Sequence, residues 1–477
     1  MSFTSLLFVV FVACVLLVYY IVPARFQWLV LLLASVIFYL KYDIKAGIFI
    51  VLSTILVWAG ALKISKAKST VVQKVILITV IALNVLILIG LKYATFLRGF
   101  LSSHGIIVPL GISFYTLALI GYLIDVYRKK IQPETNFLRV LLFTSYFPHI
   151  LQGPIARYQN LMQQFDGKKK ALSYQQLTMA LQLIIWGYIK KLVIADRAGI
   201  FVDNVYDQYL GVGGTMLFVA SLLYTIQIYA DFSGCVDIAL GVSELFGIKL
   251  QNNFSQPYLS ISINDFWRRW HITLSSWFRD YLYIPLGGNR KGKVRRWLNV
   301  LIVFTVSGLW HGVGLTYIIW GFIHGIYQVI GAGLKPVKEK LYIRMKLINS
   351  KFLYIVKLVV NFLLINQAWI MFRATSPKMA LYIMGKSISQ CSLWQLFDQT
   401  VYQYGVSQRQ MLMLLFFIII MVFVDILHEK VIRIRKMIGR CVLPVRWGIY
   451  LAALFSIILF GVYGIGYDAA DFIYMRF

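Results

Sequence analysis

The sequence predicts an all-α, polytopic integral membrane protein with a single domain over residues 1–477. Hydrophobic residues make up 60% of the chain and charged residues only 14%, whereas soluble domains carry about 25% charged residues. Apolar runs close to the ~20 residues of a membrane-spanning helix recur from end to end. They lie near 3–22, 26–40, 46–62, 74–91, 106–126, 176–195, 215–230, 298–313, 315–331, 353–372, 411–427 and 448–465. We expect the first run to be a helix that stays in the protein rather than a removed signal peptide.

The net charge of +29 comes from 47 basic and 18 acidic residues. In a soluble protein this excess would indicate nucleic acid, but here the basic residues gather between apolar runs, as the positive-inside rule describes. Some of them could contact anionic membrane lipids or an anionic substrate. Placing the basic groups within 63–74, 128–139 and 430–440 in the cytoplasm puts both termini outside. No nucleic-acid partner is expected.

The segment 143–157 is apolar but is interrupted by Pro148, Gly153 and Pro154. A segment of this kind can enter a bilayer without crossing it as a plain helix. Irregular backbone at membrane depth is tolerated only against protein or a wet cavity. We therefore expect a central hollow lined by this re-entrant segment and by the helix that begins near Asn264.

The most basic and aromatic stretch of the chain is 262–296. Ser262 and Asp265 form the spacing of a capping box, which predicts a helix start near Asn264. Aromatic and apolar residues then recur at helical spacing and place three tryptophans and one histidine on a single stripe: Trp267, Trp270, His271 and Trp277. Such a stripe fits either an anchor at the membrane interface or the lining of a substrate site.

Among the six histidines, His311 is the leading candidate for chemistry. It lies in an apolar run, where an ionisable side chain is a functional hypothesis by default, and a neutral imidazole can act as a general base. The alternative is a helix–helix contact through the neighbouring glycines. His271 could orient a substrate or bond a neighbouring helix. His149 could line the same cavity, and His324 is more readily structural.

Several other kinds of chemistry lack a signal. The four scattered cysteines form no CxxC pair, and no HExxH metal motif, GxSxG elbow or nucleotide-binding glycine loop occurs. We therefore expect no metal and no permanently bound cofactor. The coherent remaining chemistry is histidine-assisted acyl transfer from a thioester to a hydroxyl. Five basic residues could hold the phosphates of a coenzyme A donor, or could simply mark the cytoplasmic side: Arg290, Lys291, Lys293, Arg295 and Arg296.

Two other classes of function compete with an enzyme. A proton-coupled transporter or lipid flippase would use His311 as a proton relay. A non-catalytic assembly scaffold would not require His311 for its function. Internal repeats, or intramembrane acidic residues paired with basic ones, would favour transport. The sequence shows neither clearly, although Asp125, Asp231 and Asp237 lie near apolar runs and could pair with arginine or cap helices.

Several motifs, in order, resemble the bacterial branch of the membrane-bound O-acyltransferase (MBOAT) superfamily, and most of all its alginate O-acetylase type. They are FPH at 147–149, GPI at 153–155 with Arg157, NF at 253–254, PY at 257–258, DFWRRWH at 265–271, WFRDYLYIPLGGNR at 277–290, LWHG at 309–312, WG at 320–321 and HG at 324–325. The resemblance covers essentially the whole chain.

The resemblance implies a ring of transmembrane helices, with re-entrant segments, around a tunnel in the cell membrane of a bacterium. His311 would be the catalytic histidine and His271 the second family histidine. The tunnel lining would include His149, Trp267, Trp270, Trp277, Trp310 and His324. Acetyl-CoA, or another acyl thioester, would donate a group that modifies an exopolysaccharide such as alginate, or a cell-wall glycan. An extracytoplasmic SGNH-type acetyltransferase and polysaccharide-synthesis proteins would be its partners.

The end of the chain, 472–477, is similar to the terminal aromatic motif of extracytoplasmic acylation systems. Tyr474 would hand over the acyl group, although an interfacial aromatic anchor explains the same residues. The related teichoic acid D-alanyl transfer proteins share the WFRDY stretch at 277–281 and differ afterwards. D-alanyl transfer therefore remains the runner-up.

Overall fold

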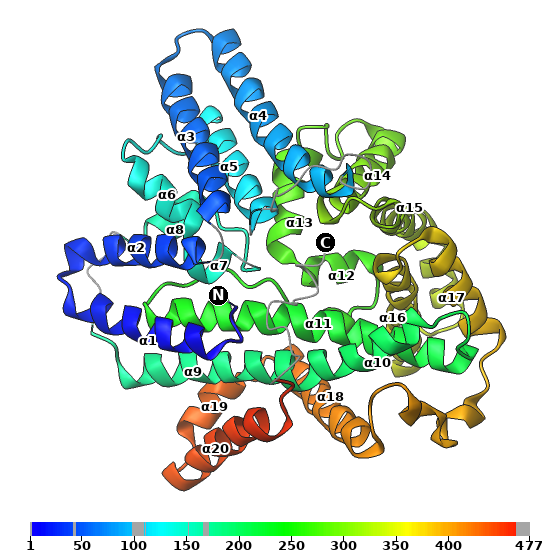
Figure 1. Cartoon of the computed structure of the whole chain (residues 1–477). Helices are drawn as coiled ribbons and strands as arrows, with labels where there is room; N and C mark the ends of the chain where they lie inside the picture. The colour runs from blue at the N-terminus through cyan, green and yellow to red at the C-terminus, as the bar shows by residue number, and fades with distance from the viewer. Residues whose placement is uncertain are drawn as a thin grey trace. The chain divides into compact units, whose positions relative to one another are not determined.

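The structure is a computed structural model that describes residues 2–41, 44–97, 109, 111–150, 152–165 and 171–463, side chains 45, 93–97 and 393 excepted. Every regular element in these ranges is helical (Figure 1). Two compact units are present. Within the described ranges, the first unit comprises residues 2–185 and 235–252, and the second comprises 186–234 and 253–463.

The first unit contains helices formed by the expected apolar runs, together with three short helices between residues 137 and 162. They are α1 (Leu6–Ile21), α2 (Gln27–Leu40), α3 (Ile44–Lys66), α4 (Thr70–Leu97), α5 (Ile112–Tyr127), α6 (Phe137–Ser145), α7 (Phe147–Ile150) and α8 (Tyr158–Met162), with parts of α9 (Tyr174–Tyr188) and α11 (Gly214–Leu245). The short α6, α7 and α8 confirm that 143–157 is not one continuous helix.

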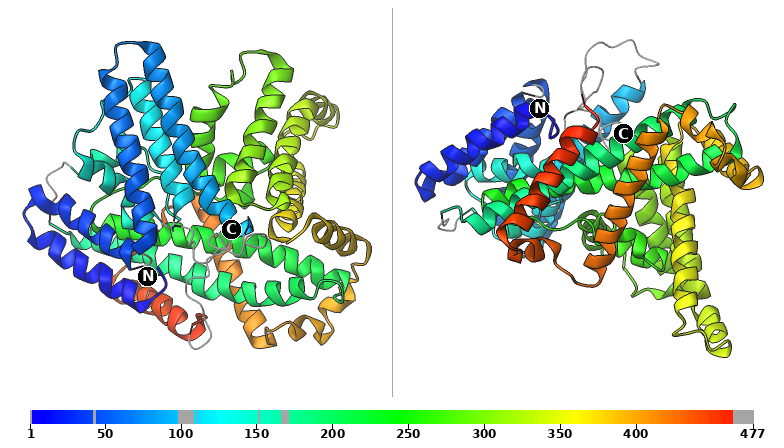
Figure 2. Two further views of the ribbon diagram at one scale, coloured as in Figure 1. Left: turned by 45° about the horizontal axis from the view of Figure 1, so that its top comes forward. Right: turned by 90° about the horizontal axis from the view of Figure 1, so that it is seen from below.

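Helices α3, α4 and α5 lie side by side in the first unit (Figure 2). A Cβ atom at Gly60 would lie 2.9 Å from Val80 of α4 and 3.6 Å from Leu123 of α5. Ser53 of α3 lies beside Tyr115 of α5. Residue numbers therefore increase in the same direction along both helices, from the pair Ser53–Tyr115 to the pair Gly60–Leu123. Helices α3 and α5 are therefore parallel, and both end at the same face of this unit.

The second unit contains the remaining helices. They are α10 (Asp196–Asp207), α12 (Ile263–Arg269), α13 (Ile272–Phe278), α14 (Gly292–His311), α15 (Leu315–Arg344), α16 (Lys351–Arg373), α17 (Pro377–Ser389), α18 (Gln408–Glu429), α19 (Ile434–Arg440) and α20 (Leu443–Phe460), with the other parts of α9 and α11. Two π-helical stretches, Ile189–Ala195 and Arg279–Tyr283, continue α9 and α13.

Eight helical segments in the described ranges are long and apolar enough to cross a membrane. The expected runs near 3–22, 26–40 and 106–126 form shorter apolar helices, Leu6–Ile21, Ala24–Leu40 and Ile112–Tyr127. The run near 298–313 forms α14, which is not among the eight and carries Lys293, Arg295 and Arg296 in its first turns. A helical protein with several membrane spans is confirmed, whereas the central tunnel stays a prediction.

Helices α14 and α15 pack through glycines at close range. A Cβ atom at Gly308 would lie 2.2 Å from the carbonyl oxygen of Tyr317, and one at Gly321 would lie 2.2 Å from that of Phe304. No side chain fits at these distances, because only hydrogen in place of Cβ lets two backbones approach so closely. The expected helix–helix contact around His311 is therefore present.

We expect Gly321→Ala to lower the melting temperature in detergent, because its methyl group must push α15 away from Phe304. Overpacking of this kind destabilises by about 1–3 kcal/mol. Gly333→Ala, on the same helix with nothing within 4 Å of its Cβ position, is the matched control. Equal melting temperatures for the two variants would contradict the close contact.

The second unit also buries a lysine between two carboxylates. Nζ of Lys191 lies 2.7 Å from Oδ1 of Asp196 and 2.7 Å from Oδ1 of Asp231. Lys191 and Asp196 are five residues apart, and the π-helical geometry of 189–195 brings such residues onto one side of the helix. Asp231 thus pairs with a lysine, and Asp125 likewise pairs with Lys130 at 3.7 Å.

Candidate active site

The aromatic segment begins as the sequence predicts. The helix α12 starts at Ile263, and Ser262 Oγ accepts a hydrogen bond from the backbone N–H of Asp265 at 3.2 Å. The carboxylate of Asp265 accepts from Ile261, one residue before the cap, at 3.3 Å. Only one half of the capping box is therefore formed.

The expectation of one continuous helix with a single aromatic stripe is wrong. The chain leaves the helix at Trp270, and His271 adopts the left-handed conformation with φ 45°. The helix α13 then begins at Ile272. His271 therefore lies at a corner of the backbone rather than on the face of a helix.

The helix is interrupted at Trp270 because the non-helical segment 253–255 forms hydrogen bonds with its backbone groups. In a continuous helix the carbonyl of Arg269 would accept from the N–H of Thr273. Here it accepts from Ser255 N–H at 2.9 Å, and Thr273 N–H donates instead to Oδ1 of the buried Asn253 at 3.2 Å. Ile272 N–H donates to the carbonyl of Asn253 at 3.0 Å. Asn253 thus sets the position of His271. The only sign of this role in the sequence is that Asn253 belongs to the NF motif at 253–254.

The three tryptophans of the segment are buried in protein. Trp267, Trp270 and Trp277 have exposed fractions of 7%, 1% and 8%. An anchor at the membrane interface would expose its aromatic rings, so this interpretation is wrong for the segment. Trp270 packs on Trp369 of α16, and Trp277 packs on Tyr281.

His311 is the last residue of α14 and is buried among aromatic rings. Its ring centroid lies 4.8 Å from Trp310, 5.1 Å from Trp320 and 5.6 Å from Phe372. Gly312 ends the helix in an extended conformation, and Tyr317 occupies the space where a Cβ at Gly312 would lie.

Three histidines of the second unit are linked by contacts between rings. The centroid of His271 lies 6.2 Å from that of Trp310, which in turn contacts His311. Trp320 contacts both His311 and His324, each at 5.1 Å. The structure therefore brings together His271, Trp310, His311, Trp320, His324 and Trp267, which we call the histidine–aromatic cluster.

His324 has a defined hydrogen-bonding role in this cluster. The indole N–H of Trp267 donates to Nδ1 of His324 at 3.2 Å, and the two rings are nearly perpendicular. His324 is fully buried. Since Nδ1 accepts, Nε2 carries the proton of the neutral ring. This bond supports the structural interpretation of His324 that the sequence favoured.

Helix α16 contributes two residues that the motifs did not indicate. Trp369 stacks on Trp320 with a centroid distance of 5.6 Å, and Phe372 contacts the rings of His311 and Trp320. Their side chains are fully buried. The only signal in the sequence is the apolar run of α16, which does not distinguish these residues from other core residues.

The five basic residues lie at the opposite end of α14 from His311. Arg290, Lys291, Lys293 and Arg295 are exposed and Arg296 is partly exposed. The preceding turn is held by Asn299, whose amide donates to the carbonyl of Gly288 at 3.1 Å. From Arg296 to His311 the helix rises about 22 Å. The structure therefore places the basic residues and His311 at opposite ends of α14.

Two other predicted residues, His149 and Tyr474, are not among the residues that define the cluster. His149 belongs to the first unit, where it is buried on α7 with its ring centroid 5.6 Å from that of Tyr146. The cavity expected to combine this segment with the aromatic segment would join two units and stays a prediction. Tyr474 and the rest of 472–477 lie outside the described residues.

Burial lowers the pKa of His271 to about 3 and that of His149 to about 4. Each pKa is depressed below the ordinary value of 6.5, so the unfolded chain binds these protons more readily than the folded protein. The resulting stability is fully present above pH 6.5 and decreases as the pH falls towards 3. Both rings are therefore neutral at physiological pH.

We expect His271→Gln to reduce the loss of thermal stability between pH 7.5 and pH 4.5, because one buried group that resists protonation is removed. Melting of the purified protein in detergent at both pH values measures the effect. The exposed His428 offers the control His428→Gln, which should retain the acid sensitivity of the wild type. An identical pH dependence in all three proteins would contradict the role of His271 burial.

Within the described residues, no group of three or more His, Cys, Asp or Glu side chains is placed to hold a metal ion. The histidine–aromatic cluster has a different chemical character. It combines imidazoles and indole N–H groups among aromatic rings. Such an arrangement can accept a proton and donate hydrogen bonds to an uncharged or partly charged substrate.

Comparison with known proteins agrees with this character. Residues 54–383 match the family model described as MBOAT, membrane-bound O-acyltransferase family. A peptidoglycan O-acetyltransferase of Helicobacter pylori is 35% identical over 75% of this chain and 72% of its own length. A probable alginate O-acetylase of Pseudomonas syringae is 35% identical over 83% of this chain and 76% of its own length.

A teichoic acid D-alanyltransferase of Bacillus subtilis is also similar, with 30% identity over 47% of this chain and 58% of its own length. Both O-acetylating relatives thus match more of the chain, and at higher identity, than this protein does. The matched region of the family model includes the whole histidine–aromatic cluster. The chain therefore belongs to the membrane-bound O-acyltransferase family and is a membrane O-acyltransferase.

Proposed function

We propose that this protein moves an acetyl group from a cytoplasmic thioester donor across the membrane, for O-acetylation of an extracytoplasmic polysaccharide or cell-wall glycan. The observation that carries this proposal is the position of His311, buried among aromatic rings at the end of α14. The O-acetylating relatives support acetyl as the group that is transferred. The source organisms of these relatives are bacteria, and the protein would act in the cell membrane of a bacterium.

In the proposed reaction, His311 is the general base. Its imidazole removes the proton from the attacking hydroxyl as the hydroxyl oxygen forms an ester bond to the acetyl carbon. The carbon–sulfur bond of the thioester breaks, and the departing thiolate receives the proton from the imidazolium. A ring that is neutral before the reaction is required for the first step, because only a neutral imidazole can accept the proton.

The proposed role of His271 is to position the reacting groups. Asn253 binds the backbone N–H groups of the two residues after His271, and Trp310 contacts the rings of both His271 and His311. A neutral imidazole can donate one hydrogen bond and accept another. It can therefore orient a hydroxyl or a thioester carbonyl without adding a charge to the site.

The length of α14 suits a long donor molecule, because it separates the basic residues from His311. Its first turns carry the exposed basic residues and its last residue is His311. We propose that Arg290, Lys291, Lys293, Arg295 and Arg296 bind the phosphates of coenzyme A, while the long thiol arm reaches towards the histidine–aromatic cluster. Arginine is well suited to phosphate because its planar guanidinium forms two parallel hydrogen bonds.

The transfer on the outer side would involve a second protein. We propose an extracytoplasmic acetyltransferase of the SGNH type, together with the polysaccharide-synthesis machinery.

Binding of the donor tests the proposal directly. The purified protein should bind acetyl-CoA and slowly release its acetyl group to water, and excess salt should weaken binding through the basic residues. A D-alanyl thioester on a carrier protein should be a poorer donor. Neither binding nor hydrolysis of acetyl-CoA, with turnover of the D-alanyl donor, would assign the chain to D-alanyl transfer instead.

We expect Tyr474→Phe to lower the rate of acetyl transfer to the outer acceptor at least tenfold, because the hydroxyl that would carry the acetyl group is lost. A tenfold decrease in rate corresponds to about 1.4 kcal/mol of activation free energy. This change removes a single hydroxyl and retains an aromatic ring, so an interfacial anchor would be preserved. Transfer to a glycan acceptor in membrane vesicles, at matched protein levels, measures the effect. Full activity of Tyr474→Phe would identify the residue as an anchor.

A further inference from the structure

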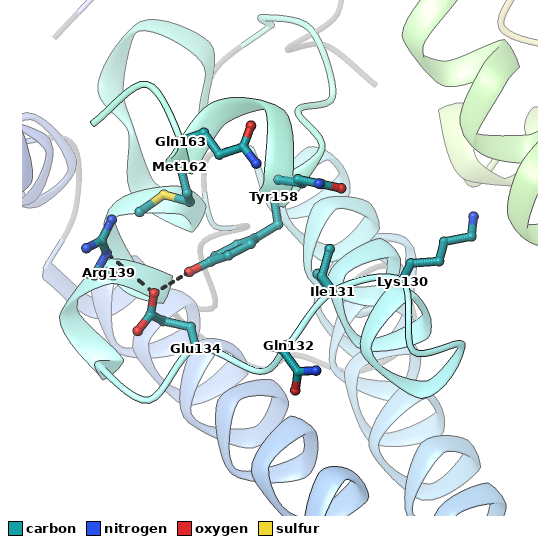
Figure 3. A pocket seen from close by; sticks show the side chains of 9 residues that line it. Lys130, Ile131, Gln132, Glu134, Arg139, Tyr158, Met162 and Gln163 are labelled. Atoms are coloured by element: carbon teal, nitrogen blue, oxygen red, sulfur yellow. Dashed lines mark hydrogen bonds and ion pairs between the residues drawn. The ribbon is translucent and has the colours of Figure 1, made fainter. Parts of the chain in front are cut away.

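A cleft of about 390 Å³ opens in the first unit, between the loop after α5 and the helix α8. Figure 3 shows it from close by, with Tyr158 reaching from α8 to Glu134 and with Lys130 and Arg139 on opposite sides of Tyr158. The lining residues are mainly polar or charged: Lys130, Ile131, Gln132, Glu134, Arg139, Tyr158, Gln159, Met162 and Gln163. The proposed acyl transfer uses none of them.

The carboxylate of Glu134 lines the cleft and is held by several polar contacts. Its Oε2 accepts from the hydroxyl of Tyr158 at 2.9 Å and lies 3.4 Å from Nε of Arg139. Its Oε1 accepts from the N–H of Asn136, and its own N–H donates to the hydroxyl of Tyr122, both at 2.9 Å. Burial and the bond to Glu134 raise the pKa of Tyr158, so its hydroxyl remains a donor. The carboxylate therefore keeps one orientation without a ligand.

The cleft offers both signs of charge to a ligand. The side chain of Lys130 is 57% exposed and pairs only loosely with Asp125, at 3.7 Å. Arg139 is 24% exposed beside Glu134. The amides of Gln132, Gln159 and Gln163 add donors and acceptors at the rim. A ligand with one anionic and one cationic group a few bonds apart would meet an opposite charge at each position.

The cleft lies at the end of the first unit that carries its basic residues. Helices α3 and α5 are parallel, so Lys63 and Lys66 in the last turns of α3 and Arg128 to Lys130 after α5 share one face. The positive-inside rule places such a face at the cytoplasmic leaflet. Leu138, next to Arg139 in sequence, is 43% exposed. An apolar side chain at this level can contact acyl chains below a lipid head group.

We propose that this cleft binds the head group of a phospholipid that carries a phosphate and a primary ammonium, which is the chemistry of phosphatidylethanolamine. The phosphate would contact Lys130, and the ammonium would contact Glu134 and the neighbouring amides. Both contacts are charge-assisted hydrogen bonds, which are shorter and stronger than neutral ones. The exposed Leu138 would offer an apolar contact to the acyl chains.

The carboxylate argues against a purely anionic ligand. A phosphate without an ammonium would be attracted by Lys130 and Arg139 but repelled by Glu134, and no group of its own would contact that carboxylate. Phosphatidylglycerol, whose head group carries only hydroxyls beside the phosphate, is such a ligand. The structure therefore predicts a preference between two common bacterial phospholipids, rather than general attraction of anionic lipid to a basic surface.

Lipid binding to the purified full-length protein tests this preference. Native mass spectrometry with phosphatidylethanolamine and phosphatidylglycerol of identical acyl chains counts the bound molecules of each. We expect the wild type to bind phosphatidylethanolamine about tenfold more tightly, which is the effect of one charge-assisted contact. Glu134→Gln should remove this preference by weakening only the ammonium-bearing lipid. Equal binding of the two lipids by the wild type would overturn the proposal.

Two further variants guard against effects on folding. Lys130→Gln changes an exposed side chain and should weaken both lipids about two- to threefold, as expected of one exposed charge contact. Glu339→Gln removes an exposed carboxylate that pairs with Lys335 on α15 at 3.8 Å, and should change neither. Unaltered binding in both Glu134→Gln and Lys130→Gln would place the lipid elsewhere. Displacement of the lipid by an equal concentration of soluble O-phosphoethanolamine would show that the cleft binds a soluble ligand instead.

Discussion

His311→Ala is expected to abolish acyl transfer while the folded protein remains in the membrane. General-base catalysis by a positioned side chain contributes about 10²–10⁴-fold to a rate, and alanine retains no group that can accept a proton. His311 contacts three aromatic rings but ends its helix, so its loss leaves the helical ladder of α14 intact. Transfer from labelled acetyl-CoA in membrane vesicles measures the effect.

The control for this variant must separate catalysis from packing. His311→Gln preserves much of the side-chain volume and can form hydrogen bonds, but it cannot act as a base near neutral pH. Both variants should show the same large loss of activity with a melting temperature near that of the wild type. Recovery of activity in His311→Gln would mean that His311 contributes a hydrogen bond rather than a proton transfer.

The second large effect is expected on stability, for Lys191→Met. The change leaves the carboxylates of Asp196 and Asp231 without the ammonium that lies 2.7 Å from each. Breaking a buried ion pair by removing one partner destabilises a protein by about 3–5 kcal/mol. Thermal or denaturant unfolding in detergent should show a clear decrease, together with low yields from the membrane.

Lys335→Met is the matched control, because Lys335 pairs with Glu339 at the surface with 72% of its side chain exposed. We expect it to change stability by less than about 0.5 kcal/mol. The double variant Lys191→Met with Asp231→Leu should recover part of the loss, since one unpaired buried charge is removed. Equal stability of Lys191→Met and the control would contradict a structural role for this ion pair.

The sequence predicts the helical membrane fold well, because long apolar runs allow few other structures. It fails where hydrogen bonds from distant segments replace those of a helix. The spacing of Trp267, Trp270 and Trp277 is that of one helix. Asn253 and Ser255 nevertheless bind the backbone groups of Arg269, Ile272 and Thr273, where that helix would continue. Similarly, nothing in the pattern of α9 indicates that a π-helical stretch pairs Lys191 with Asp196.

The site shows the same division between what a motif reveals and what packing adds. His271, Trp310, His311 and His324 are recognisable from their motifs, and the structure joins them through ring contacts. Phe372 comes from α16 and has no motif of its own, since an aromatic residue in an apolar helix is ordinary. Its position beside His311 depends on how α16 packs, which spacing within one helix cannot predict.

The buried Lys191 network also bears on the competing function. Intramembrane acidic residues paired with basic ones are typical of proton-coupled transporters, and the second unit contains such a pair. Family membership nevertheless identifies the chain as an acyltransferase. We therefore assign the network to stabilising the π-helical stretch, where Leu192 also accepts a hydrogen bond from Val462 at 3.0 Å.

The most direct test of the proposed function is the alkali-labile acetate on cell-surface glycans. Two strains lacking the native gene are compared, one expressing the wild-type chain and one expressing His311→Ala at the same membrane level. We expect surface acetate in the first strain and its absence in the second, and fractionation of the glycan then names the acceptor. Equal acetate in both strains would contradict O-acetyl transfer through His311.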